Sequence, residues 1–134
     1  MPRSTLEPRD RELLEAPNFV HVSTLREDGS IHTIPIWVDT DGETVLLNTA
    51  EGRSWPKNLR RNGTVTLTVL NMENPYEYLT VTGSVAEDTH EGADAHIDKM
   101  AKKYLDKDSY PFRQDGEQRV IFRIRPERVH RHGS

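Results

Sequence analysis

The sequence predicts a mainly β fold with a few helices, built as an antiparallel β-barrel that is closed or partly open. Three observations favour this class: six runs rich in β-branched and aromatic residues, Asp-Gly turn signals between the early runs, and only three stretches with helical character. Successive strands without regular strand–helix alternation indicate a barrel more than a βαβ sheet. At 134 residues the chain has the size of one domain, so we expect a single domain over residues 1–134.

Local patterns place the expected strands and the first helix. A proline followed by a pair of leucines among charged residues indicates a short leading helix at 8–16. Strands are expected at 19–25, 31–38, 44–49, 64–70, 78–87 and 119–125. Asp28-Gly29 and Asp41-Gly42 would turn the first three into a meander. Gly83 is expected at a bulge or bend, and the sixth strand is expected to end at Pro126.

A later helix is expected to carry one apolar face. Asp88 with Glu91 three residues on resembles a capping box that would open this helix. Its apolar positions recur at helical spacing and are Ala93, Ile97, Met100, Ala101 and Tyr104. Residues 106–116 are polar and contain a proline and a glycine, so we expect a loop between this helix and the last strand.

Residues 48–61 read as a strand end, a short glycine loop and a helix that carries several cations. The N-terminus of a helix offers unpaired N–H groups and the positive end of the peptide dipole. Ser54 is expected to cap this helix, while Arg53 and Lys57 add positive charge beside it. The segment therefore predicts an anion site. The alternative, a capped surface helix whose cations face water, stays open at this point.

Composition limits the functions that the chain can have. A net charge of −4 argues against a general nucleic-acid or acidic-membrane binder, and without cysteine the chain has no disulfide, thiolate metal site or cysteine nucleophile. No apolar run approaches the roughly 20 residues of a membrane span, and the N-terminus lacks an apolar signal core. We therefore expect a cytoplasmic protein. Its 34% hydrophobic content indicates a thin core, so small molecules or a second copy are the expected partners.

No pattern for metal binding or covalent catalysis stands out. His130 and His132 come closest to a zinc pair, because residues two apart on a strand share a face, but no third ligand lies near them in sequence. His90 and His96 are expected on a helix surface. The serines lack a G-x-S-x-G elbow, and the glycines match neither the Walker nor the Rossmann pattern. We therefore predict no metal and no catalytic side chain.

The aromatic residues favour a flat ligand. Trp37 ends the second expected strand, Trp55 lies on the cationic helix, and Tyr76 and Tyr78 flank the start of the fifth strand. Aromatic side chains and sheet backbone could hold a planar ring while the cations hold its charged tail, which is the layout of a flavin-type site. The alternative is that these rings pack in the core or in a dimer interface.

Five segments in fixed order carry a family resemblance. They are Phe-Val-His-Val-Ser-Thr-Leu at 19–25 with the following Asp-Gly, Pro-Ile-Trp at 35–37, residues 49–61 with Asn-Leu-Arg-Arg at 58–61, Asn-Pro-Tyr-Glu-Tyr-Leu at 74–79 with the following valine and glycine, and residues 120–129. With them the chain resembles the pyridoxamine-phosphate-oxidase-like split β-barrel superfamily over nearly its whole length. Asn-Pro-Tyr and Tyr-Pro-Phe at 110–112 resemble its deazaflavin branch, which uses coenzyme F420. The resemblance implies a six-stranded antiparallel split β-barrel of the FMN-binding type.

The resemblance also implies a homodimer with two cofactor sites at the subunit interface. By position, the deazaflavin ring would be lined by His32, Thr33, Ile34, Pro35, Ile36 and Trp37. The phosphate-bearing tail would be held by Asn48, Thr49, Ala50, Arg53, Ser54, Lys57 and Asn58, with Trp55 beside them and Tyr76 reaching across from the partner. Many relatives carry a lysine where this chain has Trp55. Lys57 would then substitute for it, or the site would prefer a different tail or another cofactor.

The implied activity is an F420-dependent oxidoreductase, a reductase that passes a hydride from the reduced deazaflavin to an electron-poor organic acceptor. A quinone, an unsaturated ketone or a tetrapyrrole-like compound would fit this role. Such a reaction needs mainly orientation and exclusion of water from the protein, which agrees with a sequence that offers no candidate nucleophile. Three alternatives stay open: an FMN-binding oxidoreductase of the same fold, a carrier of flavin, deazaflavin or haem without turnover, and a split-barrel dimer without a cofactor.

Overall fold

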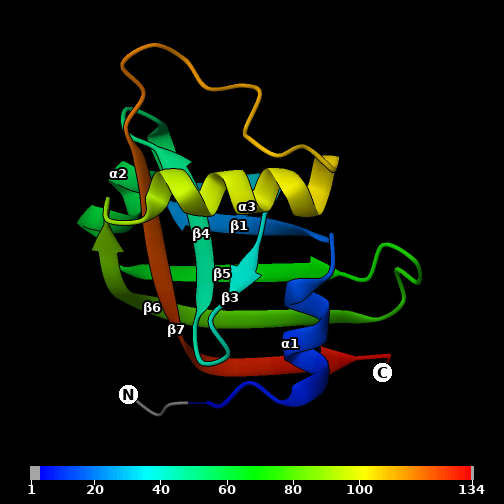
Figure 1. Ribbon diagram of the computed structural model, residues 1–134. Coiled ribbons are helices and arrows are strands. Elements are labelled where there is room, and N and C mark those ends of the chain that lie inside the picture. The colour runs from blue at the N-terminus through cyan, green and yellow to red at the C-terminus, as the bar shows by residue number, and fades with distance from the viewer. Residues whose placement is uncertain (1–3, 134) are drawn as a thin grey trace.

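The computed structural model describes residues 4–133 and consists of three helices and seven strands (Figure 1). In chain order they are α1 (Pro8–Glu15), β1 (Phe19–Leu25), β2 (Ile31–Trp37), β3 (Asp39–Thr40), β4 (Val45–Ala50), α2 (Ser54–Arg61), β5 (Thr64–Leu70), β6 (Tyr78–Thr89), α3 (Ala93–Leu105) and β7 (Arg119–His132). None of the helices in the described range is long and apolar enough to cross a membrane.

All seven strands form one antiparallel sheet in the order β2-β1-β5-β6-β7-β4-β3. Its two edge strands, β2 and β3, are consecutive in the chain, and only Val38 separates them. The sheet therefore curls until its edges approach each other, and the barrel is left open between them (Figure 1). This confirms the mainly β, antiparallel split-barrel class. Seven strands are present instead of six because the two-residue strand β3 was not predicted.

The first three predicted strands do not form the expected meander, because the third of them, β4, does not pair with β2. β1 and β2 form the predicted hairpin around Asp28-Gly29. β4 does not continue from β2, because it pairs with the C-terminal strand β7 on one side and with β3 on the other. The cationic helix α2 therefore follows a strand that is held by the end of the chain.

β6 and β7 bend together, and the predicted end of the last strand at Pro126 is wrong. β7 continues through this proline to His132, and Pro126 lies opposite Gly83 where the register between the two strands shifts. A Cβ atom on Gly83 would lie 2.2 Å from the Arg125 carbonyl oxygen, so only glycine allows the two backbones to approach this closely. The expected bulge at Gly83 is thus confirmed, and the same irregularity accommodates a proline inside a long strand.

One hydrophobic core fills the inside of the curled sheet. Alternate residues of β1, β4, β5, β6 and β7 point inward, and α1 and α2 each add two large side chains to them. The helix residues are Leu13, Leu14, Trp55 and Leu59. Helix α3 packs elsewhere, through a small cluster of Leu46, Ala93 and Ile121. It lies across the open side of the barrel, in front of β4 (Figure 1).

Both predicted helix caps are wrong. Ser54 is the first residue of α2, and the N-cap position belongs to Arg53, whose side chain makes no capping hydrogen bond. Helix α3 begins at Ala93 after Gly92, which has φ 75°, and not at Asp88. Asp88 is still part of β6, where it pairs with β7 and accepts hydrogen bonds from Arg60. Cross-strand pairing therefore outweighed the local capping signal.

Candidate functional site

A cavity of about 180 Å³ lies between the free edge of the barrel and α3. Strands β2 and β4, helix α3 and the loop before β7 all contribute to its wall. The lining residues are Phe19, Pro35, Ile36, Trp37, Leu46, Asn48, Arg53, His96, Ile97, Met100, Tyr110, Phe112 and Arg119. Most of them are aromatic or aliphatic, two are arginines, and no carboxylate lines the cavity in the part of the chain that the structure describes.

Trp37 forms the aromatic wall of this cavity. The Tyr104 ring stacks on it with centroids 4.9 Å apart and an angle of 4° between the planes, and Tyr110 meets it edge-on at 6.0 Å. Burial raises the pKa of Tyr104, and its hydroxyl donates to the Asn18 carbonyl and accepts from the Val38 N–H. The indole is therefore supported from behind by a ring that is itself hydrogen-bonded to the backbone.

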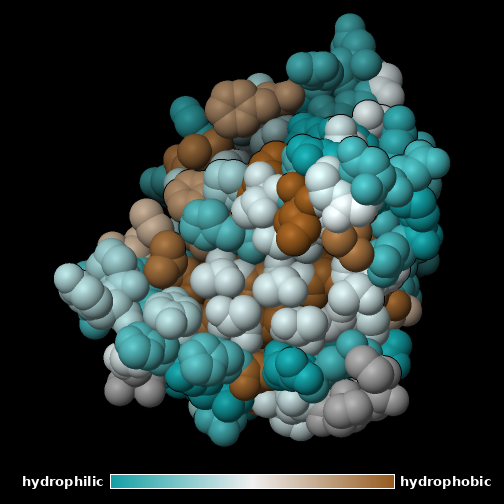
Figure 2. All heavy atoms as spheres, turned by 180° about the vertical axis from the view of Figure 1, so that it is seen from behind, coloured by the Kyte–Doolittle hydropathy of each residue, from teal (hydrophilic) through white to brown (hydrophobic). Residues whose placement is uncertain are grey.

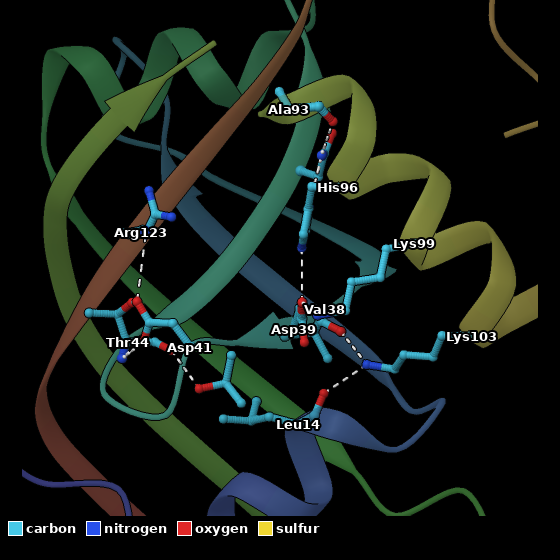
Figure 3. A network of polar contacts seen from close by, with 12 residues as sticks. Leu14, Val38, Asp39, Asp41, Thr44, Ala93, His96, Lys99, Lys103 and Arg123 are labelled. Carbon is cyan, nitrogen blue, oxygen red and sulfur yellow. Dashed lines mark hydrogen bonds and ion pairs between the residues drawn. The ribbon is translucent and has the colours of Figure 1, made fainter. Parts of the chain in front are cut away.

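A chain of hydrogen bonds fixes the polar side of the cavity. The Asn48 amide nitrogen lies 3.0 Å from both the Ala93 carbonyl oxygen and the His96 Nδ1, and its oxygen lies 3.0 Å from Arg119 Nε. Arginine can only donate, so the Asn48 oxygen accepts, the nitrogen donates, and His96 Nδ1 must accept. His96 therefore carries its proton on Nε2 and donates it to Asp39 Oδ2 at 2.9 Å (Figure 3).

Asp39 anchors the far end of this chain of bonds. Burial raises the pKa of its carboxyl group, but hydrogen bonds from His96 and the Thr40 backbone and the charge of Lys99 outweigh burial and lower the pKa to about 2. Lys99 Nζ lies 3.3 Å from the same carboxylate oxygen. The expectation that His96 lies on a helix surface is wrong, because its ring is nearly buried between α3 and this carboxylate.

Lys103 holds the other end of α3 against the barrel. Its Nζ donates to the carbonyl oxygens of Leu14 at 2.9 Å and Val38 at 2.6 Å (Figure 3). Burial lowers the pKa of this lysine to about 8. One side chain thus joins α1, the β2–β3 junction and α3 just behind the aromatic wall.

Arg119 forms part of the cavity floor and is only 4% exposed. Its Nε donates to Asn48, its Nη1 bonds to Glu117, and its guanidinium carbon lies 5.0 Å from the centre of the Tyr110 ring. Nη2 makes no hydrogen bond to any residue between 4 and 133. The guanidinium is therefore held in place while one nitrogen remains available to a molecule in the cavity.

The cations of the 48–61 segment divide into two kinds. Arg60 bonds Glu51 and Asp88, and Arg61 bonds the Leu25 carbonyl, so both serve the fold. Arg53 and Lys57 are exposed, and neither forms an ion pair with a carboxylate of residues 4–133. The N–H groups of the first two residues of α2 also lack a partner in this range. The two cations predicted to meet an anion are thus the two that the fold leaves available.

The structure brings together some of the predicted cofactor residues. Pro35, Ile36, Trp37, Asn48 and Arg53 line the cavity, and Ala50 and Arg53 line an adjoining hollow beside the loop before β7. The Asn48 amide is engaged by its neighbours, so it shapes the wall and orients Arg119.

Other predicted residues lie elsewhere. Trp55 is 1% exposed and packs against Phe122 in the core, Thr49 is fully buried, and Asn58 is buried and donates to Thr24. Tyr76 is 83% exposed in the loop between β5 and β6 and does not line the cavity.

The edge strand β2 offers backbone groups to the open side of the barrel. In the hairpin the Arg26 N–H bonds the Ser30 carbonyl, and an antiparallel ladder repeats in steps of two residues. The backbone groups of the even-numbered residues of β2 therefore face β1, and those of Thr33 and Trp37 point away from it. Among residues 4–133, the buried Nδ1 of His32 has no hydrogen-bond partner.

The sequence did not point to several residues of the cavity. His96 and Arg119 have partners that only the fold brings near them, and Leu46 looks like any other apolar strand residue. The apolar face of α3 was predicted correctly, but Ile97 and Met100 of this face line the cavity. For His96, the only signal in the sequence was its place directly before Ile97 on the apolar face of the helix, and this is weak evidence for a cavity residue.

Comparisons with known proteins agree with this fold. The model of the pyridoxamine 5'-phosphate oxidase family matches residues 6–133. No curated protein sequence matches the chain. Among solved structures, an F420 reductase is similar with a TM-score of 0.80 and 30% identity, over 90% of this chain and 94% of that protein.

Two more distant structures share the fold. A putative pyridoxamine 5'-phosphate oxidase from Listeria innocua has a TM-score of 0.70 and 18% identity over 92% of this chain and 94% of its own. A conserved hypothetical protein from Mycobacterium tuberculosis has a TM-score of 0.72 and 18% identity over 97% of this chain and 86% of its own. The family match over nearly the whole described range, on a curled antiparallel sheet, shows that the chain belongs to the pyridoxamine 5'-phosphate oxidase family of split β-barrel proteins.

Proposed function

We propose that the protein is an F420-dependent oxidoreductase, which passes a hydride between the reduced deazaflavin and an electron-poor organic acceptor. The observation that carries this proposal is a cavity walled by aromatic rings and lined by Arg119 and by Arg53, which precedes the first residue of α2. Among residues 4–133, no carboxylate lines this cavity. Family membership supports a flavin-type cofactor, and the similar F420 reductase favours the deazaflavin. The acceptor, the cytoplasmic location and the extent of the domain over residues 1–134 remain predictions.

The residues present fit a planar ring with a phosphate-bearing tail. Arg53 and Lys57 offer two unpaired cations, and the first N–H groups of α2, beginning at Ser54, add the positive end of the helix dipole. Trp37 and the free edge of β2 offer a flat surface and backbone hydrogen bonds, and the unpartnered Nδ1 of His32 lies on the same strand. Trp55 is buried in the core and cannot bind the tail. Lys57 therefore supplies the positive charge that many relatives supply with a lysine at position 55.

A bound deazaflavin supplies the hydride chemistry by itself. The chain then has to bind the cofactor, hold the ring and the acceptor in position and exclude water, for which an apolar cavity is suited. We place no catalytic side chain in it. His96 cannot serve as a general acid while both of its ring nitrogens are engaged by Asn48 and Asp39.

A specific observation favours two of the three alternatives left open by the sequence. FMN binding is favoured by the replacement of the family lysine by Trp55 and by the wider family, whose fold binds flavins. A carrier of flavin, deazaflavin or haem without turnover is favoured because no carboxylate among the described residues lines the cavity and because both ring nitrogens of His96 are already engaged. Tight binding of a cofactor without reduction of any acceptor in a broad panel would support the carrier.

We also propose a homodimer that forms through the outer face of the sheet. Cross-strand pairs place small polar side chains in rows there, for example Thr66 beside Thr82 and Thr68 beside Thr80. Figure 2 shows the resulting field of near-neutral, pale side chains over the back of the molecule. A second subunit would bring its exposed Tyr76 toward the cofactor groove. Sedimentation analysis tests this proposal, and a monomer would remove both the interface and the role of Tyr76.

The test of the proposed function is a fluorescence titration with oxidised F420, run beside FMN at the same salt concentration. The double variant Arg53→Ala and Lys57→Ala should weaken F420 binding at least about tenfold, because each charged hydrogen bond to an anion contributes about 1.5–3 kcal/mol. The control is Lys102→Ala with Lys107→Ala, which removes the same net charge from exposed positions on α3 and the following loop. Equal affinity of the Arg53/Lys57 variant and the wild type would refute the assignment.

A further inference from the structure

The cavity contains one buried cation whose hydrogen-bonding capacity is only partly used. Arg119 is 4% exposed, with Nε bound to Asn48 and Nη1 bound to Glu117, while Nη2 has no partner among residues 4–133. The surrounding wall is aromatic and aliphatic. In such surroundings a free guanidinium nitrogen can donate a hydrogen bond to an oxygen of a ligand, and this bond is strongest when the oxygen is negatively charged.

The direction of this nitrogen is set by the fold. Asn48 accepts from Arg119 Nε only because its amide nitrogen is fixed by the Ala93 carbonyl and by His96. Tyr110 lies under the face of the guanidinium at 5.0 Å. The side chain is therefore held before any ligand arrives, unlike the exposed Arg53 at the mouth.

The local charge favours an anion over a neutral group. Glu117 balances Arg119, but the pKa of Glu117 is lowered, against the effect of burial, by a Gln114 backbone hydrogen bond and by the charges of both Arg119 and Arg53. Both cations thus lie near this carboxylate, but only Arg119 bonds it, and the carboxylate does not line the cavity. An ionised ring oxygen would therefore meet cations, and no carboxylate of residues 4–133, in the cavity lining.

We propose that Arg119 binds the ionised 8-hydroxyl oxygen of the deazaflavin and thereby selects F420 over FMN. This inference rests on the proposed function. The 8-hydroxyl is a phenol conjugated to an electron-poor ring, so it is more acidic than a tyrosine, whose pKa is about 10. FMN carries a methyl group at that position, which accepts no hydrogen bond and would leave Nη2 of Arg119 buried without a partner.

The test measures the ionisation of the bound chromophore and does not depend on turnover. The absorbance of oxidised F420 follows its 8-hydroxyl ionisation, so a pH titration of the wild-type complex gives the chromophore pKa in the site. A nearby cation favours the anion, and we expect binding to lower this pKa by about 1 to 3 relative to free F420. By linkage, each pKa unit of this shift means that the site binds the ionised form about tenfold more tightly relative to the neutral form.

Variants identify the group responsible. Arg119→Gln should return the chromophore pKa toward that of free F420 and reduce the preference for F420 over FMN at least about tenfold, while Arg119→Lys keeps most of the pKa effect. The control is Arg123→Gln on the same strand, where the side chain bonds Glu87 and Asp41 instead of the cavity. Thermal melts establish that each variant is folded.

The outcomes separate the two levels of the proposal. If wild-type protein does not bind F420, both the proposed function and this inference are overturned. If F420 binds but its chromophore pKa is unchanged or raised, the role of Arg119 is overturned while the cofactor assignment stands. That measurement needs only the wild-type protein, so it decides the matter even if Arg119→Gln fails to fold. A lowered pKa that survives in folded Arg119→Gln also overturns the role of Arg119.

Discussion

Replacing Lys103 with methionine should change how the free energy of unfolding depends on pH. This lysine lies between α1, the β2–β3 junction and α3, where burial lowers its pKa from 10.5 to about 8. The charged ammonium is thus less favourable in the folded protein than in the unfolded chain. Methionine has a similar length and no charge, so Lys103→Met removes this titration while it still fills the space.

The magnitude follows from the two pKa values. They differ by about 2.5, which corresponds to about 3 kcal/mol at about 1.4 kcal/mol for each pH unit. Below pH 8 the lysine is protonated in both states, and the folded state carries the full penalty. Between pH 8 and pH 10.5 the folded protein has released the proton and the unfolded chain still holds it, so wild-type stability rises with pH. The bonds to the Leu14 and Val38 carbonyls favour the ammonium, which makes about 3 kcal/mol an upper limit.

The assay is urea unfolding of the wild type and of Lys103→Met from about pH 7 to about pH 10. Subtracting one curve from the other cancels the titration of groups that both proteins share, including Tyr104. The wild type should gain stability relative to the variant as the pH rises above about 8. Lys107→Met, in an exposed loop, serves as the control and should show no such trend. A difference between wild type and Lys103→Met that is constant over this range would refute the reasoning.

Two further predictions concern the fold. Gly83→Ala should lower the free energy of unfolding by at least about 2 kcal/mol, because its Cβ would lie 2.2 Å from the Arg125 carbonyl oxygen; a melting temperature equal to that of the wild type would contradict this. Asp39→Asn should make the protein less sensitive to acid. The pKa of Asp39 is lowered to about 2, so its stabilising contribution is present above about pH 4 and is lost as the pH falls toward 2, an effect of about 2 kcal/mol that acid titration of both proteins would reveal. Parallel acid transitions would show that the contacts of Asp39 with His96 and Lys99 contribute little.

Local patterns were sufficient for much of the fold. The strands at 19–25 and 64–70 were predicted with their observed bounds, because both are runs rich in β-branched residues and 64–70 also alternates apolar with polar positions. The hairpin at Asp28-Gly29 and the bulge at Gly83 were also predicted, since glycine is needed at both for backbone reasons. The pair Arg53 and Lys57 was singled out in the same way, because the cations of a helix start are neighbours in sequence, but the predicted cap by Ser54 was wrong.

Several of the errors share one physical cause: the pairing of distant strands cannot be recognised from the sequence of either strand alone. β4 joins β7, and this contact places Asn48 beside Arg119 across 71 residues of chain. The same pairing extends β6 past Asp88, where a helix cap had been predicted. Trp55 lies on a cationic helix by sequence, but the curl of the sheet directs it into the core. Each of these placements depends on the pairing and curl of the whole sheet.

Arg53 and Arg119 have different roles in the cavity because of the way in which α3 is held against the sheet. This helix buries an apolar face that includes Ile97 and Met100 and stacks Tyr104 on Trp37 of β2, and polar contacts further fix its position. They do so at both ends, through the His96 bonds to Asn48 and Asp39 and through the Lys103 bonds to the backbone. The floor that holds Arg119 is therefore rigid, whereas Arg53 at the mouth is free to adapt. Affinity for the anionic tail should then arise at the mouth and selectivity for the ring at the floor, so substitutions at Arg53 and at Arg119 should change different parts of the binding free energy.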